Sequence, residues 1–68
     1  MATAIINGRR TEIPSTASDE EVRQMGAISP ERTLIKRERE GNFVIPRGSR
    51  VDVKDGDVFV DAPRRIKG

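Results

Sequence analysis

The dipeptide Asn7-Gly8 is the local signal that most constrains how this chain can fold. It separates the β-branched apolar run of residues 3–7 from the alternating polar and apolar run of residues 9–13. A two-residue type I′ turn needs positive φ at both positions, and Asn followed by Gly is the pair that best tolerates it. Pro14 removes a backbone donor and closes the second strand. The chain is therefore predicted to open with a β-hairpin.

Helical signals follow the hairpin in residues 18–26. Ser18 can cap the helix and Glu21, three residues later, completes a capping box. The acidic first turn favours the positive end of the helix dipole, and Gly26 is the expected stop. The pattern predicts a short helix with a narrow apolar stripe. That stripe carries Val22 and Met25, with Ile28 just beyond the end.

Three more strands are indicated in the second half of the chain. Residues 32–39 read as a strand that turns through "EGN" into residues 43–46. The segment 47–53 reads as short and irregular, and Gly56 is expected in the left-handed position of a turn. Residues 58–62 read as the last strand, ended by a proline. The predicted order is β-β-α-β-β-β.

This order indicates an α+β domain of the ubiquitin-like β-grasp type, in which one helix crosses a mixed sheet. The last strand is expected in the centre, beside the first, with a domain over residues 1–62 and a flexible C-terminal tail over residues 63–68. Strand parity is left open for the adjacent pairs Leu34/Ile35 and Val58/Phe59. The expected core is Ile5 or Ile6, Ile13, Val22, Met25, Ile28, Leu34, Phe43 or Val44, Val58 and Val60.

Composition excludes several classes of function. The chain has neither cysteine nor histidine, so thiol chemistry, disulfides and the usual general base are missing. We expect a protein that is not an enzyme and needs neither cofactor nor metal. No apolar run approaches a membrane span, and the first charges follow a short apolar stretch, the reverse of a secretory signal. A cytoplasmic protein is expected.

Acidic and basic residues are nearly balanced, with 13 cations, 11 anions and a net charge of +2. The alternating charges of residues 36–40 are interpreted as a solvated strand face. The aspartates around Gly56 lack the loop length and terminal glutamate of a calcium site, so they are interpreted as turn formers. These aspartates are Asp52, Asp55 and Asp57.

The segments "IINGRR", "MGAISPER", "TLIKRE", "EGN" and "VDVKDGDVFV" resemble the bacterial ubiquitin-like domains of the multiubiquitin type. The resemblance covers residues 5–62. It implies a protein modifier in a bacterial conjugation system, handled by an activating-type adenylating enzyme, a conjugating-type enzyme and a JAB-type peptidase. Modifiers of this kind commonly end in a double glycine, whereas here Lys67 precedes Gly68.

The resemblance points to two candidate sites. The first is the tail, where Gly68 has no Cβ and its carboxylate can enter a narrow adenylation channel. Arg64, Arg65 and Lys67 would guide it toward an acidic groove. The second is the outer sheet face, where ubiquitin itself presents an isoleucine. Ile35 is the candidate there, and Phe59 joins it if the parity of the last strand allows.

Two alternatives belong to other classes of function. A small basic module could bind duplex nucleic acid through phosphate contacts, although single-strand binding is disfavoured because the chain has two Phe, no Tyr and no Trp. An assembly subunit could instead associate through its sheet edge. The cations considered for the nucleic-acid alternative are Arg9, Arg10, Arg32, Arg47 and Arg50.

Overall fold

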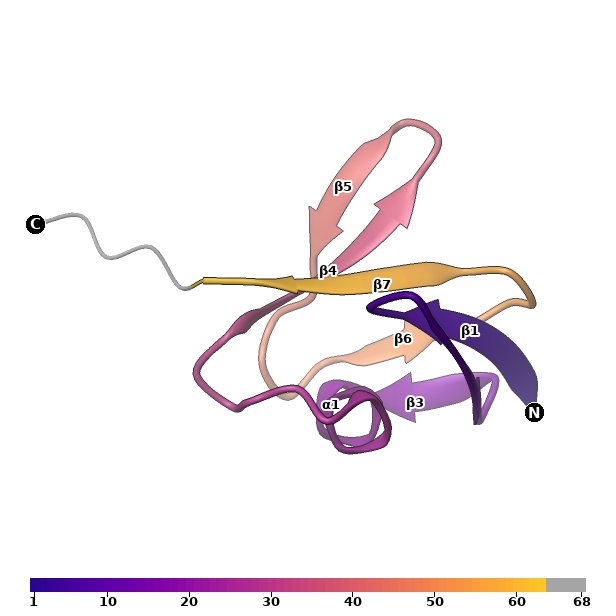
Figure 1. Cartoon of the computed structure of the whole chain (residues 1–68), viewed down its shortest axis with the longest axis horizontal. Helices are drawn as coiled ribbons and strands as arrows, with labels where there is room; N and C mark the ends of the chain where they lie inside the picture. The colour runs from indigo at the N-terminus through magenta and orange to yellow at the C-terminus, as the bar shows by residue number, and fades with distance from the viewer. Residues whose placement is uncertain (64–68) are drawn as a thin grey trace, which may run out of the picture.

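A mixed five-stranded sheet organises the chain in the computed structural model, which describes residues 1–63 (Figure 1). The strand order is β2-β1-β7-β4-β5. Its strands are β1 (Ala2–Ile6), β2 (Arg9–Ile13), β4 (Thr33–Glu38), β5 (Gly41–Val44) and β7 (Val58–Ala62). A two-stranded sheet of β3 (Thr16–Ser18) and β6 (Arg50–Asp52) and the helix α1 (Asp19–Gly26) complete the described part. The predicted α+β class is confirmed.

The last strand lies in the centre of the five-stranded sheet, as predicted. β7 runs parallel to β1, with Ile5 beside Val58 and Ile6 beside Phe59, and antiparallel to β4 on its other side. The N-terminal hairpin is also confirmed. Asn7 and Gly8 both have positive φ, 50° and 82°, between the antiparallel strands β1 and β2.

The predicted capping box starts α1. The backbone N–H of Glu21 donates to Oγ of Ser18 at 3.2 Å, and the N–H of Ser18 donates back to Oε1 of Glu21 at 2.9 Å. The helix ends at Gly26 as expected, but Ala27 adopts the left-handed conformation, with φ of 55°. The predicted stop at Gly26 is therefore confirmed, and the residue that turns the chain out of the helix is Ala27.

The two-stranded sheet was not predicted. β3 lies directly before the helix cap, and β6 falls in the segment expected to be irregular. The strands pair antiparallel with Ala17 opposite Val51, and the N–H of Asp19 donates to the carbonyl of Ser49 at 2.9 Å. This ribbon joins the start of α1 to the loop that follows β5.

The core contains five of the predicted residues, namely Ile6, Ile13, Val22, Ile28 and Leu34. Two of the core predictions were wrong. Met25 is 46% exposed, and neither of the alternatives Phe43 and Val44 is buried, because they are 47% and 62% exposed. Val58 and Val60 are only half-buried, because the opposite parity of β7 places Phe59 inside. The buried apolar residues missed from the sequence are Ala2, Ala4, Ala17, Ile45, Val53 and Phe59.

The helix covers one face of the five-stranded sheet at the β1–β2 side, where α1 packs against β2 and β3. The β4–β5 hairpin projects away from the helix and from the β3–β6 ribbon (Figure 1). Within the described residues no helix is long and apolar enough to cross a membrane.

Candidate protein-interaction face

Ile35 lies on the sheet face opposite the core. Successive residues of a strand point to opposite faces, and its neighbour Leu34 is fully buried. Ile35 is half-buried and pairs with Val60 of β7 on one side and with Val44 of β5 on the other. The parity left open by the sequence is thus settled with Leu34 inside and Ile35 on the outer face.

The same parity brings further apolar side chains to this outer face. Val58 lies two residues from Val60 on β7, and Ile5 pairs with Val58 across the parallel β1–β7 contact. All of these residues alternate with buried neighbours on their own strands, apart from Val44 on the exposed strand β5. We call this set the outer patch: Ile5, Ile35, Val44, Val58 and Val60.

Two arginines flank the outer patch. Arg10 of β2 pairs with Ile5, and Arg37 of β4 pairs with Val58. Both arginines are exposed, and neither forms an ion pair with another residue of the range 1–63. The outer face therefore combines an apolar centre with positive charge at two of its margins.

Phe59 cannot contribute to this face, which corrects its assignment to a partner-binding surface. Its side chain is 0% exposed and packs in the core beside Ile6. An aromatic residue in the middle of the central strand fills the space between the sheet and the helix layer, and its burial there stabilises the fold. Ile35 keeps its predicted position on the outer face.

The predicted conjugation tail lies outside the described residues. Arg64, Arg65, Lys67 and Gly68 all follow Pro63, the last residue described. The described end of β7 is Ala62, which pairs with Thr33 of β4. β7 thus carries two residues of the outer patch and leads directly into the tail.

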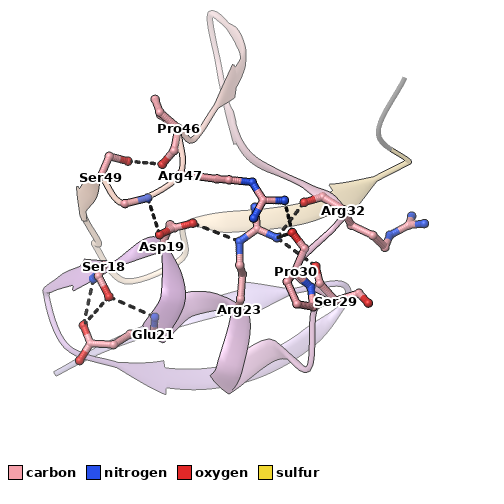
Figure 2. A network of polar contacts seen from close by, with 11 residues as sticks. Ser18, Asp19, Glu21, Arg23, Ser29, Pro30, Arg32, Pro46, Arg47 and Ser49 are labelled. Atoms are coloured by element: carbon pink, nitrogen blue, oxygen red, sulfur yellow. Dashed lines mark hydrogen bonds and ion pairs between the residues drawn. The ribbon is translucent and has the colours of Figure 1, made fainter. Parts of the chain in front are cut away.

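A network of polar groups, separate from the outer patch, is centred on a buried ion pair (Figure 2). Nε of Arg23 donates to Oδ2 of Asp19 at 3.1 Å, and both side chains are less than a tenth exposed. Nη1 of Arg23 donates to the carbonyls of Ser29 at 3.0 Å and of Arg32 at 2.7 Å. The other carboxylate oxygen of Asp19 accepts from the N–H of Gly48 at 2.9 Å.

This network connects α1 to the loops on both sides of the β4–β5 hairpin, as Figure 2 shows. No buried side-chain nitrogen or oxygen of the described residues lacks a hydrogen-bond partner. A pocket of about 150 Å³ beside it is lined in part by Arg23, Arg32, Arg47 and Glu31. Arg32 is already paired with Asp61 at 2.7 Å. The network therefore holds the loops in place, and its buried side-chain nitrogens and oxygens all have partners within residues 1–63.

The arginines considered for nucleic-acid binding do not line up on one surface. Arg9 and Arg10 are neighbours on β2, so they point to opposite faces. Arg32 pairs with Asp61, and Arg47 donates to the carbonyl of Pro30. Arg50 lies on β6, in the other sheet.

Lys36 joins β4 to the end of β6 and to the turn between β6 and β7. Its Nζ lies 3.2 Å from Oε2 of Glu38 and 3.4 Å from Oδ2 of Asp57, and it donates to the carbonyl of Asp52 at 3.1 Å. Burial by itself lowers the pKa of Lys36, but the hydrogen bonds and attraction of Glu38 and Asp57 outweigh it and raise the pKa above its ordinary value. Asp57 also accepts from the N–H of Lys54 at 2.8 Å, which is the turn-forming role predicted for it.

Comparisons with protein-family models, with curated proteins and with solved structures find no match.

Proposed function

We propose that this chain is a ubiquitin-like protein modifier with a β-grasp fold, bound by partner proteins on the outer patch and activated through Gly68. The fold supports this proposal through its strand order and the parallel contact between β1 and β7, which is the arrangement expected for a β-grasp. The observation that carries it is the position of Ile35, between Val60 and Val44 on the face of the sheet opposite the core.

The outer patch suits a partner surface with apolar side chains surrounded by carboxylates. Apolar side chains at the centre of an interface supply most of the binding energy when they are fully desolvated. Arg10 and Arg37 at the margins favour acidic partners, mainly by accelerating association. We propose that the adenylating enzyme and the conjugating enzyme present such a surface, because each must hold the domain while it handles the tail.

The proposed activation begins when the Gly68 carboxylate attacks the α-phosphorus of ATP. A carboxylate–phosphorus bond forms, the bond from the α-phosphorus to the bridging oxygen breaks, and pyrophosphate leaves. A thiolate of the enzyme then attacks the acyl carbon, which forms a thioester and releases AMP. The enzyme must supply that sulfur, because the chain has no cysteine.

Intact-mass spectrometry tests this proposal. The chain with a free carboxylate at Gly68 is mixed with ATP and an activating-type adenylating enzyme of a bacterial ubiquitin-like system. We expect a covalent enzyme adduct that is absent when Gly68 is deleted. An adduct that persists undiminished in the Gly68 deletion would exclude activation through the tail.

A matched pair of substitutions tests the outer patch in the same assay. Ile35→Glu should slow adduct formation by about tenfold or more, the change expected from losing about 1.4 kcal/mol of binding. Met25→Glu places the same charge on the exposed surface of α1 and should leave the rate unchanged. Thermal unfolding of both variants verifies that they fold. Equal rates for the two variants would show that the enzyme does not contact the outer patch.

A further inference from the structure

The two edges of the five-stranded sheet differ in how they are protected. β2 forms one edge and carries Arg9, Arg10 and Glu12. β5 forms the other edge, and its sequence, Gly-Asn-Phe-Val, contains no charge. Natural proteins commonly place charges on an edge strand to prevent it from pairing with another chain. The charges of β2 therefore disfavour pairing with another chain, whereas β5 has no charged residue that would prevent it.

The free backbone groups of β5 can be assigned from the ladder. The N–H of Ile45 donates to the carbonyl of Leu34 at 2.8 Å. Hydrogen-bonded pairs alternate along an antiparallel ladder, so the backbone of Phe43, two residues earlier, is also hydrogen-bonded to the backbone of Lys36. The alternate residues, Asn42 and Val44, direct their N–H and C=O groups away from β4. Asn42 and Val44 can therefore each donate and accept a backbone hydrogen bond with a further strand at this edge.

The side chains of this edge are also uncovered. Phe43 is 47% exposed and Val44 is 62% exposed, and they point to opposite faces of the strand. Phe43 lies on the same face as Phe59, since both pair with Lys36. The hairpin projects beyond the helix (Figure 1), so α1 does not cover this face at β5.

We propose that β5 is a dimerisation edge whose occupant is β5 of a second copy of this chain. The free groups at Asn42 and Val44 are symmetric about Phe43, so an antiparallel second copy pairs Asn42 with Val44 and Val44 with Asn42. Both pairs then exchange reciprocal backbone hydrogen bonds. The two-fold axis passes midway between Phe43 and the same residue of the second copy, which lies directly opposite.

This register covers the exposed aromatic. Directly opposite residues that do not exchange hydrogen bonds have their side chains closest together, and an aromatic pair at such a position adds to the stability of a sheet. Pro46, which has no N–H, and the positive φ of Gly41, 148°, limit pairing to this short segment. The interface is isologous and closes at the dimer, because the remaining edge is the charged strand β2.

Sedimentation equilibrium from micromolar to millimolar concentration tests the proposal on the full chain. The average mass should rise from that of one chain, 7.6 kDa, toward twice that value. Val44→Pro removes an N–H that points away from β4, so it should abolish the rise and keep the β4–β5 ladder. Glu12→Pro is the matched control, because its N–H points outward at the β2 edge, and it should dimerise like the original chain.

A cysteine variant gives a second measurement that needs no proline. The chain has no cysteine, so Phe43→Cys introduces a single thiol on the proposed axis, at a separation suited to a disulfide. Under mild oxidation it should cross-link faster than Glu12→Cys. A mass that stays at one chain at millimolar concentration, growth beyond the dimer, loss of the dimer in Glu12→Pro, or equal cross-linking rates would each overturn the proposal. Failure here leaves the Gly68 adduct unaffected, so the two proposals are tested separately.

Discussion

Gly26 packs directly against the side chain of Ile6. A Cβ atom added to Gly26 would stand 2.4 Å from Cγ2 of Ile6, closer than two carbon atoms can approach. Ile6 is 1% exposed and belongs to the core, so it has little space into which it can move. The glycine at the end of α1 thus allows the helix to contact β1.

We predict that Gly26→Ala destabilises the protein. Alanine improves helix propensity by about 1 kcal/mol, but forcing an extra carbon into a packed site costs about 1–3 kcal/mol. The steric term should prevail, because the contact is with a buried side chain. Urea denaturation measures the free energy of unfolding, and a more stable variant would show that the helix can shift away from Ile6.

Ala27→Gly should change stability in the opposite direction. Ala27 has φ of 55°, a left-handed conformation that costs an L-residue about 1–2 kcal/mol. Glycine relieves this strain, although it loses more conformational entropy on folding, by about 0.5–1 kcal/mol. A net gain of a few tenths to about 1 kcal/mol is expected. The same denaturation series checks it, and a loss of stability would contradict the strain argument.

The elements that could be predicted from the sequence are those that depend on interactions between residues close together in the chain. The turn at Asn7-Gly8 and the capping box of Ser18 and Glu21 use residues close together in the chain, and both form as predicted. β3 and β6 lack such signals. Their pairing joins Ala17 to Val51, distant positions whose contact depends on the complete fold.

The faces of the strands were harder to predict than the strands themselves. Phe59 is inside and Val60 is outside. β7 lies at the centre of the sheet, where one face meets the core and the other carries the outer patch. Both faces require apolar residues, so the sequence "VFV" shows no alternation. Phe43 and Val44 read as core because they are apolar, but the projecting hairpin carries them past the helix.

Replacing Arg23 should strongly destabilise the fold. Arg23→Met leaves the buried Asp19 carboxylate without its ion-pair partner and frees the carbonyls of Ser29 and Arg32. Breaking a buried pair in this way costs about 3–5 kcal/mol, which approaches the whole stability of so small a domain. Circular dichroism should show a largely unfolded chain. Arg37→Met, at an exposed position, is the control and should stay within about 0.5 kcal/mol.

Retention of the folded state in Arg23→Met, with stability close to that of the original chain, would contradict this expectation. It would mean that water or a rearranged loop satisfies Asp19. The variant Asp19→Asn provides an independent measurement, because it keeps an acceptor for the N–H of Gly48 and removes the charge. We expect it to be less destabilising than Arg23→Met.

The last prediction concerns alkaline pH and Lys36. Its pKa in the folded chain is raised above the ordinary value of 10.5, because the contacts with Glu38 and Asp57 outweigh burial. A raised pKa means that folding favours the charged form. The contribution to stability is therefore complete below the unfolded pKa and is lost as the pH rises through the folded pKa. The original chain should lose stability across this alkaline range.

The variant Lys36→Met has no amine at this position, so its stability contains no contribution from the titration of Lys36. The free energy of unfolding, measured by urea denaturation at a series of pH values, should be higher for the original chain near neutral pH. The difference between the two proteins should narrow as the pH rises past 10.5, because the original chain then loses its charged lysine as well. A difference that is constant with pH would show that the Nζ contacts to Glu38 and Asp57 do not favour the charged amine, and that Lys36 stabilises β4 only through the packing of its aliphatic stem.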